Sequence, residues 1–472
     1  MSVFRKITLN TLIASGAKII DTVFALFLIA LLTRYLGTEG YGKYTTIIAY
    51  VNIFITFANL GLYNILLRDI GKPGADESEL SSIAFTLRFV AGLIIVPVSI
   101  LIAFLLPYPP ILKIGITIAG LSTLFLSLYQ VLVPIFQKHF KIIYVSMAEL
   151  ANRIIYLGLA FVLFTKFNSG LIPIVWAMVI ASFVNFILVF CFAQRFTKVK
   201  ISFDWKKWKL LLKEALPIGA SIIFTLIYFR IDTVMLSIMK PAGDVGIYGL
   251  AYKILENLIF FPAMFVGFVV PVLSRYYVED LQKFKETFQK VFNIFILGIV
   301  PLVIGLIFTA SPIVRLLGGE PFMAASPVLQ ILSVAVGFIF LGSLYGQGVI
   351  IIKKQFVGMW IYMAGAIFNI LINLYFIPRF SYTGAAITTA LTELFITISL
   401  IWIVSRKTHF FPSLKIFSKA FLAILPVIIF LYLFGNLHII LLVAISAIIY
   451  SAVVLLLGGI SKKDIKLFLH HA

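Results

Sequence analysis

The sequence predicts an all-α polytopic membrane protein with about 14 transmembrane helices, from its composition, its hydropathy pattern and its charge distribution. Of 472 residues, 62% are hydrophobic and 12% are charged, with a mean hydropathy of +1.12. Soluble proteins carry roughly a quarter charged residues and could not cover so apolar a core. A helix needs about 20 mostly apolar residues to cross a hydrocarbon layer. Such spans are predicted at residues 9–34, 42–67, 82–107, 111–136, 142–165, 170–194, 214–239, 245–274, 287–310, 326–351, 356–378, 384–405, 416–434 and 437–459.

The net charge of +20 is distributed unevenly over the loops between these spans. Of the 38 lysines and arginines, 26 fall in one alternate set of loops and tails, seven in the other set, and five within spans. Basic loops stay on the cytoplasmic side. We therefore expect a multi-pass protein of the cell membrane with both termini in the cytoplasm. The charge then orients the chain beside membrane lipids, and no nucleic-acid partner is expected.

Two similar halves are predicted on either side of a basic stretch. Residues 16–20 (GAKII) correspond to residues 219–223 (GASII), and residues 42–44 (GKY) to residues 246–248 (GIY). The predicted organisation is an N-lobe (1–197), an amphipathic basic linker (198–213), a C-lobe (214–405), and two further spans with a cytoplasmic tail (406–472). Trp205 and Trp208 favour a linker helix in the headgroup plane. A simple extension of the span at 214–239 is the alternative.

Catalytic signatures are absent from the sequence. It has no His-Glu-x-x-His, Cys-x-x-Cys or Walker loop, and Cys191 is its single cysteine. We therefore expect no enzyme and no cofactor, and transport that is passive or driven by an ion gradient.

Ionisable residues within spans are candidate functional residues, because each costs several kcal/mol unless it is paired or hydrated. Three helical pairs have two open interpretations, local ion pairing or contact with a substrate: Lys18 with Asp21, Glu149 with Arg153, and Lys253 with Glu256. No oppositely charged residue stands one helical turn from four further residues: Arg88, Arg230, Asp232 and Glu393. Snorkelling to the cytoplasmic surface is the alternative for Arg88. Embedded cations around one cavity would suit a phosphate or pyrophosphate, which makes Lys18, Arg88, Arg153, Arg230 and Lys253 the candidate substrate-binding residues.

Small polar residues mark two late spans. Asn369 and Asn373 lie one turn apart, and Thr388, Thr392 and Glu393 follow in the next span. With Asp232 they offer oxygen atoms of the kind that bind a monovalent cation. Asp21 is a further candidate ion-coupling residue. Hydrogen bonding between helices is the alternative.

The segment TRYLGTEGYGKY at residues 33–44, followed by Asn59-Leu60-Gly61-Leu62 and Arg68, resembles the opening of bacterial and archaeal polysaccharide transporters. These are O-antigen-type flippases for lipid-linked oligosaccharides, in the multidrug/oligosaccharidyl-lipid/polysaccharide (MOP) superfamily. Asn369, Asn373, Ile377-Pro378, Gly384-Ala385-Ala386 and Glu393 resemble the later signature of that family.

The resemblance implies a MATE-like fold of two pseudo-symmetric six-helix lobes with two C-terminal helices, working by alternating access. It implies a substrate of polyprenyl-pyrophosphate-linked oligosaccharide for surface polysaccharide, with glycosyltransferases or a polymerase as candidate partners. In related lipid II flippases a sodium site matches Asp232, Asn369 and Asn373, with Thr388 or Thr392 as a further ligand. The amide at Asn373 stands where those relatives have a carboxylate, so a proton remains an alternative coupling ion.

Two other functions compete with the flippase. A multidrug or cation antiporter of the same fold would use a buried N-lobe carboxylate, and Asp21 favours it while nearby Lys18 counts against it. A membrane scaffold or an intramembrane transferase is the third hypothesis, but a scaffold has no use for embedded charges.

Overall fold

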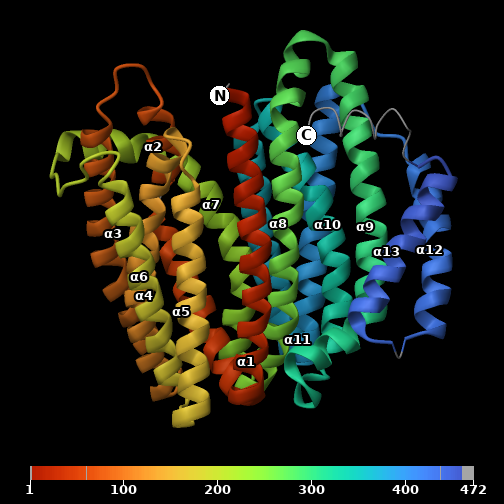
Figure 1. The fold of residues 1–472 in the computed structure, drawn as a ribbon, viewed down its shortest axis with the longest axis horizontal. Helices are drawn as coiled ribbons and strands as arrows, with labels where there is room; N and C mark the ends of the chain where they lie inside the picture. Colours follow the sequence, from red (N-terminus) through yellow and green to blue (C-terminus); the bar gives the residue numbers. More distant parts are fainter. Residues whose placement is uncertain (1–2, 60, 436, 460–472) are drawn as a thin grey trace. The chain divides into compact units, whose positions relative to one another are not determined.

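The computed structural model describes residues 3–59, 61–435 and 437–459, and all regular structure in those ranges is helical. The chain forms two compact units, residues 1–246 and 247–472. The first contains α1 (Val3–Asn59), α2 (Leu62–Ile70), α3 (Glu77–Leu105), α4 (Pro110–Lys138), α5 (Ile143–Phe167), α6 (Leu171–Ala193) and α7 (Trp205–Met239). The second contains most of α8 (Ala242–Glu279), then α9 (Leu281–Gly318), η1 (Glu320–Phe322), α10 (Ala325–Ile351), α11 (Gln355–Thr408), α12 (Lys415–Leu433) and α13 (Ile439–Leu456) (Figure 1).

The predicted membrane spans are confirmed as helices. Eleven helices in the described ranges are long and apolar enough to cross a membrane. Two of them each join two predicted spans across a sharp break, α1 at Gly37 (φ 64°) and α11 at Ser381 (φ 49°). With the 35-residue α7, these helices account for the fourteen predicted spans.

The second predicted span is wrong at its end. It was expected to continue to residue 67, but α1 ends at Asn59 and a new short helix, α2, begins at Leu62. Gly61 between them has φ 73°, a left-handed conformation that glycine adopts without steric cost and that commonly ends helices. The hydropathy pattern did not indicate this break, because Gly61 is a single glycine among residues that are compatible with a helix.

The linker between the predicted lobes is held along α3. Ser82 Oγ accepts a hydrogen bond from Lys200 N at 2.9 Å, and Thr86 Oγ1 accepts one from Ser202 N at 2.8 Å. Helix α7 then starts at Trp205 and continues to Met239, which favours an extension of the span over a separate surface helix. Trp205 is exposed, whereas Trp208 is buried among apolar side chains of α2 and α3.

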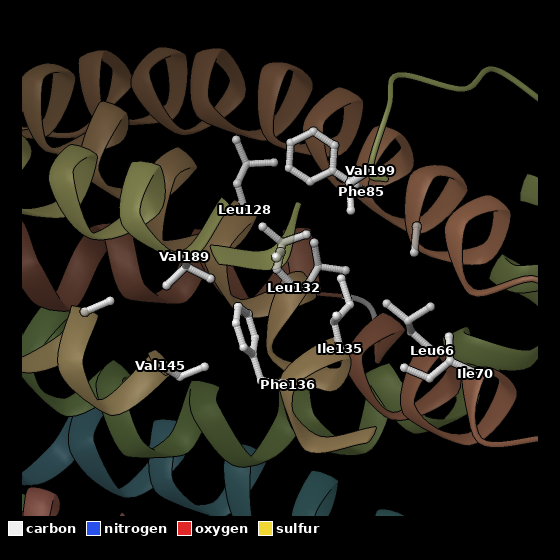
Figure 2. Close-up of a cluster of buried hydrophobic side chains, with 14 residues drawn as sticks. Leu66, Ile70, Phe85, Leu128, Leu132, Ile135, Phe136, Val145, Val189 and Val199 are labelled. Atoms are coloured by element: carbon white, nitrogen blue, oxygen red, sulfur yellow. The ribbon is translucent and has the colours of Figure 1, made fainter. Parts of the chain in front are cut away.

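A buried apolar cluster holds α2 to the neighbouring helices of the first unit. Figure 2 shows side chains from α2, α3, α4, α5 and α6 converging, with Val199 of the linker among them. Phe136 and Ile135 of α4 are fully buried at its centre. Burying such side chains stabilises by roughly 1.5–3 kcal/mol each, so α2 has a fixed place after the break.

Two repeat-related glycines pack against each other within the first unit. A β-carbon at Gly42 would overlap the carbonyl oxygen of Ala242 and lie 2.9 Å from the nitrogen of Gly246. A β-carbon at Gly246 would overlap the carbonyl oxygen of Thr38 in the same way. Each glycine thus meets the carbonyl of the residue four positions before the other. The corresponding segments of the sequence repeat therefore form a reciprocal backbone contact that excludes a side chain on both sides.

In the second unit, α10 packs against α9 and α11, and α12 and α13 pack against each other and against α9. Gly337 of α10 faces Ile299 and Val303 of α9 closely enough that even a methyl group would need them to move. Small residues permit this close approach of apolar helices, the usual means of packing within membranes.

Candidate functional site

An ion pair joins the first and fifth helices of the first unit. Arg153 Nε donates to Asp21 Oδ1 at 2.8 Å, and the two side chains are 29% and 12% exposed. Arg153 therefore pairs across a helix interface with Asp21, an ion pair different from the local one with Glu149 that was one of its two open interpretations. The side chain of Lys18, the other expected partner of Asp21, lies outside the described residues.

Tyrosine hydroxyls surround this pair. Tyr129 of α4 donates to Glu149 Oε1 at 3.4 Å, and Tyr156 of α5 donates to Tyr44 of α1 at 3.0 Å. Tyr156 is buried, and Tyr129 and Tyr44 are partly buried. The interior of the first unit thus holds two carboxylates, a guanidinium and three phenols, a composition that a purely structural apolar core would avoid.

Arg88 of α3 is 1% exposed, so the snorkelling alternative is wrong. Its guanidinium donates to neutral oxygens only: the Ser127 hydroxyl at 2.7 Å, the Asn59 carbonyl at 2.6 Å and the Gln130 side-chain oxygen at 3.3 Å. No carboxylate among the described residues forms an ion pair with it. The Asn59 carbonyl belongs to the last residue of α1, where the helix dipole contributes partial negative charge that offsets the arginine in part.

These acceptors were missed at the sequence level. Ser127 and Gln130 lie one turn apart inside a span that is otherwise apolar, and Asn59 stands two residues before the helix-ending Gly61. Polar residues at helical spacing within a span were the available signal, but only the fold shows that they face Arg88.

Further predicted residues of the first unit lie on α7. Arg230 is partly buried and Asp232 is buried there. On α8, Lys253 forms an ion pair with Glu256 one turn away, with its Nζ 2.7 Å from Oε2. The pairing alternative is therefore confirmed for Lys253, whose charge is offset within its own helix.

The two arms of α11 bring together the predicted polar cluster of the second unit. Asn373 Nδ2 donates to Asn369 Oδ1 at 3.0 Å, and Asn369 Nδ2 donates to Thr392 Oγ1 at 3.3 Å. The hydroxyls of Thr388 and Thr392 each donate to the carbonyl four residues earlier. These residues and Glu393 are all buried. Hydrogen bonding between spans, the alternative to an ion site, is thus present among them.

A multi-pass membrane protein with charged and polar groups buried among its helices has the construction of a secondary transporter. The profile of the family described as "Polysaccharide biosynthesis protein" matches residues 7–277, more than half of the chain. The chain belongs to this family.

Two curated relatives are similar in sequence. An uncharacterized membrane protein of Methanocaldococcus jannaschii is 24% identical over 255 residues, which cover 53% of this chain and 50% of the relative; the chain thus matches about half of that protein's length. A Shigella flexneri protein named "Putative O-antigen transporter" is 23% identical over 414 residues, 84% of this chain and 96% of the relative.

Solved structures share the fold at low sequence identity. The lipid II flippase MurJ in an inward closed conformation has a TM-score of 0.78 at 19% identity, covering 93% of this chain and 97% of its own. An inward-facing multidrug resistance MATE family transporter of the MOP superfamily has a TM-score of 0.67 at 12% identity, covering 84% and 98%. The predicted MATE-like fold is therefore confirmed.

Proposed function

We propose that this protein is a flippase that moves polyprenyl-pyrophosphate-linked oligosaccharide from the cytoplasmic to the outer leaflet for surface polysaccharide assembly. Membership of the polysaccharide biosynthesis protein family supports this proposal. The ion pair of Asp21 with Arg153 favours this proposal over the antiporter alternative. A cation antiporter needs that carboxylate for its substrate, but here a guanidinium already neutralises it.

The proposed mechanism is alternating access between two lobes, with the divisions at residues 197 and 214 and both termini in the cytoplasm. The head of the substrate carries the negative charge of a pyrophosphate, which needs cationic partners inside the membrane. Arg88 is the strongest candidate because its guanidinium contacts neutral acceptors only. Arg153 would serve after its ion pair opens, and Arg230, Lys253 and Lys18 are the remaining candidates. Glycosyltransferases and a polymerase would supply and consume the substrate.

Genetic complementation tests the proposed function. In a host whose own gene for this protein is deleted, we expect loss of surface polysaccharide and accumulation of lipid-linked oligosaccharide in the cytoplasmic leaflet. The wild-type gene should restore both. Unchanged polysaccharide after deletion, or export of cationic drugs that is lost in Asp21→Asn, would contradict the flippase and favour the antiporter.

A sodium ion is the proposed coupling ion, with a proton as the alternative. The residues of the α11 cluster fit such a site in part, because buried amide and hydroxyl oxygens are suitable cation ligands and Asn369 and Thr392 already lie within hydrogen-bond distance. The Asn369 side-chain oxygen also accepts a hydrogen bond from Asn373, which leaves one of its two lone pairs for a cation.

Thermal unfolding of the purified protein tests sodium binding. We expect sodium chloride to raise the midpoint relative to choline chloride at equal ionic strength, since a ligand of the folded state stabilises it. Asn369→Leu should abolish the difference, whereas Asn373→Asp, which adds a carboxylate, should enlarge it. Equal midpoints in the two salts for the wild type and for Asn373→Asp would exclude the sodium site.

A further inference from the structure

A pocket of about 260 Å³ opens beside the break between α1 and α2. It is lined by Asn59, Gly61, Tyr63, Asn64, Arg88, Gln130 and Val133. Sites for drug-sized ligands have volumes of roughly 300–1,000 Å³. The pocket lies slightly below this range, a size for a small polar ligand or for the polar end of a larger molecule.

Arg88 has donors left over in this pocket. A guanidinium carries five N–H groups, one on Nε and two on each terminal nitrogen. Nε donates to Ser127, Nη1 to the Asn59 carbonyl and Nη2 to Gln130. Each terminal nitrogen thus has one N–H group without an acceptor among the described residues. A buried cation with unused donors and no carboxylate partner is costly unless an anion joins it.

Asn59 provides an unused acceptor in the same pocket. Its side-chain Oδ1 is buried and has no hydrogen-bond partner in the described part of the chain. A buried acceptor without a donor costs roughly 1–3 kcal/mol. Tyr63 does not supply that donor, because its hydroxyl donates to Gln137 at 2.9 Å.

A single ligand satisfies both demands when it combines an anionic oxygen with a neighbouring hydroxyl. We propose that the pocket beside Arg88 binds a sugar phosphate group, with its phosphate oxygens on Arg88 and a sugar hydroxyl donating to Asn59. Charge-assisted bonds to a guanidinium fork are the strong ones in phosphate recognition. A fully ionised phosphate monoester without a sugar has no hydrogen to donate to Asn59, and a neutral sugar would leave the arginine without a counter-ion.

The sugar phosphate has two candidate sources, a free glycosyl phosphate or the glycosyl pyrophosphate end of the transported lipid. The second source rests on the proposed function and deepens it, by assigning the first sugar and its phosphate to the α1–α2 break. The first source would make the pocket a regulatory site. The two share the same contacts, so the binding experiment addresses the pocket and a cellular experiment addresses the source.

Binding is measured on the purified full-length protein as a shift of its thermal-unfolding midpoint. The probes, used at pH 8, are glucose 1-phosphate, methyl phosphate and methyl glucoside, which carry both groups, the anion alone and the hydroxyls alone. We expect glucose 1-phosphate to bind more tightly than methyl phosphate, and methyl glucoside to give no shift. Equal shifts with all three, or none with glucose 1-phosphate, would overturn the proposal.

Variants separate the two contacts. Arg88→Gln should weaken the binding of glucose 1-phosphate by about 100-fold, the effect of losing a charged hydrogen bond. Asn59→Leu should bind glucose 1-phosphate only as tightly as methyl phosphate. Arg195→Gln, which removes a cation elsewhere in the same unit, should leave the binding of both phosphate compounds unchanged. If Arg88→Gln does not fold, Arg88→Lys replaces it, with an expected loss of about tenfold because the fork is gone. Binding that survives these Arg88 changes would overturn the site.

Surface polysaccharide in cells then identifies the source. If Arg88→Gln loses both glucose 1-phosphate binding and polysaccharide, the pocket holds the transported lipid. If binding is lost while polysaccharide stays normal, the site stands as a regulatory one and Arg88 is no longer a candidate for substrate binding, while the flippase function itself is unaffected. Normal polysaccharide in the gene deletion would instead refute the proposed function and leave the binding result standing.

Discussion

Replacing Gly42 with alanine is expected to destabilise the protein by about 3 kcal/mol or more, at the upper end for overpacking in a close-packed interior. The added β-carbon would overlap the carbonyl oxygen of Ala242, and its neighbour is again backbone, the nitrogen of Gly246. A flexible side chain could rotate away, but a carbonyl within a helix can move only with the helix. Thermal or chemical unfolding of the purified variant measures the effect.

Gly246→Ala should have a similar effect through the reciprocal contact with Thr38. The double variant should lose less stability than the sum of the two single losses, because one separation of the two segments relieves both clashes. Gly158→Ala is the matched control: it lies on α5 of the same unit, a β-carbon there meets nothing within 4 Å, and alanine favours a helix by up to about 1 kcal/mol. Equal stability of Gly42→Ala and Gly158→Ala would contradict the close contact.

Asp21→Asn is expected to abolish transport and to cost about 2–3 kcal/mol of stability. Removing one partner of a buried ion pair leaves an uncompensated charge, which typically costs 3–5 kcal/mol. The cost is set lower here because Arg153 keeps 29% of its side-chain surface exposed. Arg153→Gln should cost a similar amount by leaving Asp21 without its guanidinium.

A double-mutant cycle tests this coupling directly. Asp21→Asn combined with Arg153→Gln should recover much of the stability, because neither charge is then left alone. The exposed pair of Glu39 with Lys43 supplies the control, and Glu39→Gln should leave stability nearly unchanged. Strictly additive effects of Asp21→Asn and Arg153→Gln would show that the two side chains do not interact.

The sequence predicted the helices well wherever hydropathy along the chain was sufficient to locate them. Apolar runs of span length placed α3 to α6 within a few residues, and the run at 326–351 matches α10. The extra turns of α9 on both sides of its predicted span were missed, since they continue past the apolar stretch with polar residues such as Lys283. Hydropathy indicates the part of a helix that lies in lipid, whereas the helix itself begins and ends at its capping residues. For α9 the capping residue at the start is Asp280.

Partners across helices could not be predicted in the same way. Spacing along one helix suggested Glu149 for Arg153, but the rotation of α5 about its axis turns the guanidinium toward Asp21 of α1. That rotation is set by packing between helices. Lys253, by contrast, pairs with Glu256, one of the two interpretations that its spacing allowed, because both residues lie on the same helix.

The most direct test of the proposed function is translocation in proteoliposomes. The purified protein is reconstituted with polyprenyl-pyrophosphate oligosaccharide that carries a fluorophore on the sugar, and a membrane-impermeant quencher reports how much faces outward. The proposed function predicts protein-dependent movement of this lipid between leaflets, lost in Arg88→Gln and Asp21→Asn and retained in Arg195→Gln. Movement no faster than in protein-free liposomes, with the protein folded and correctly inserted, would contradict it.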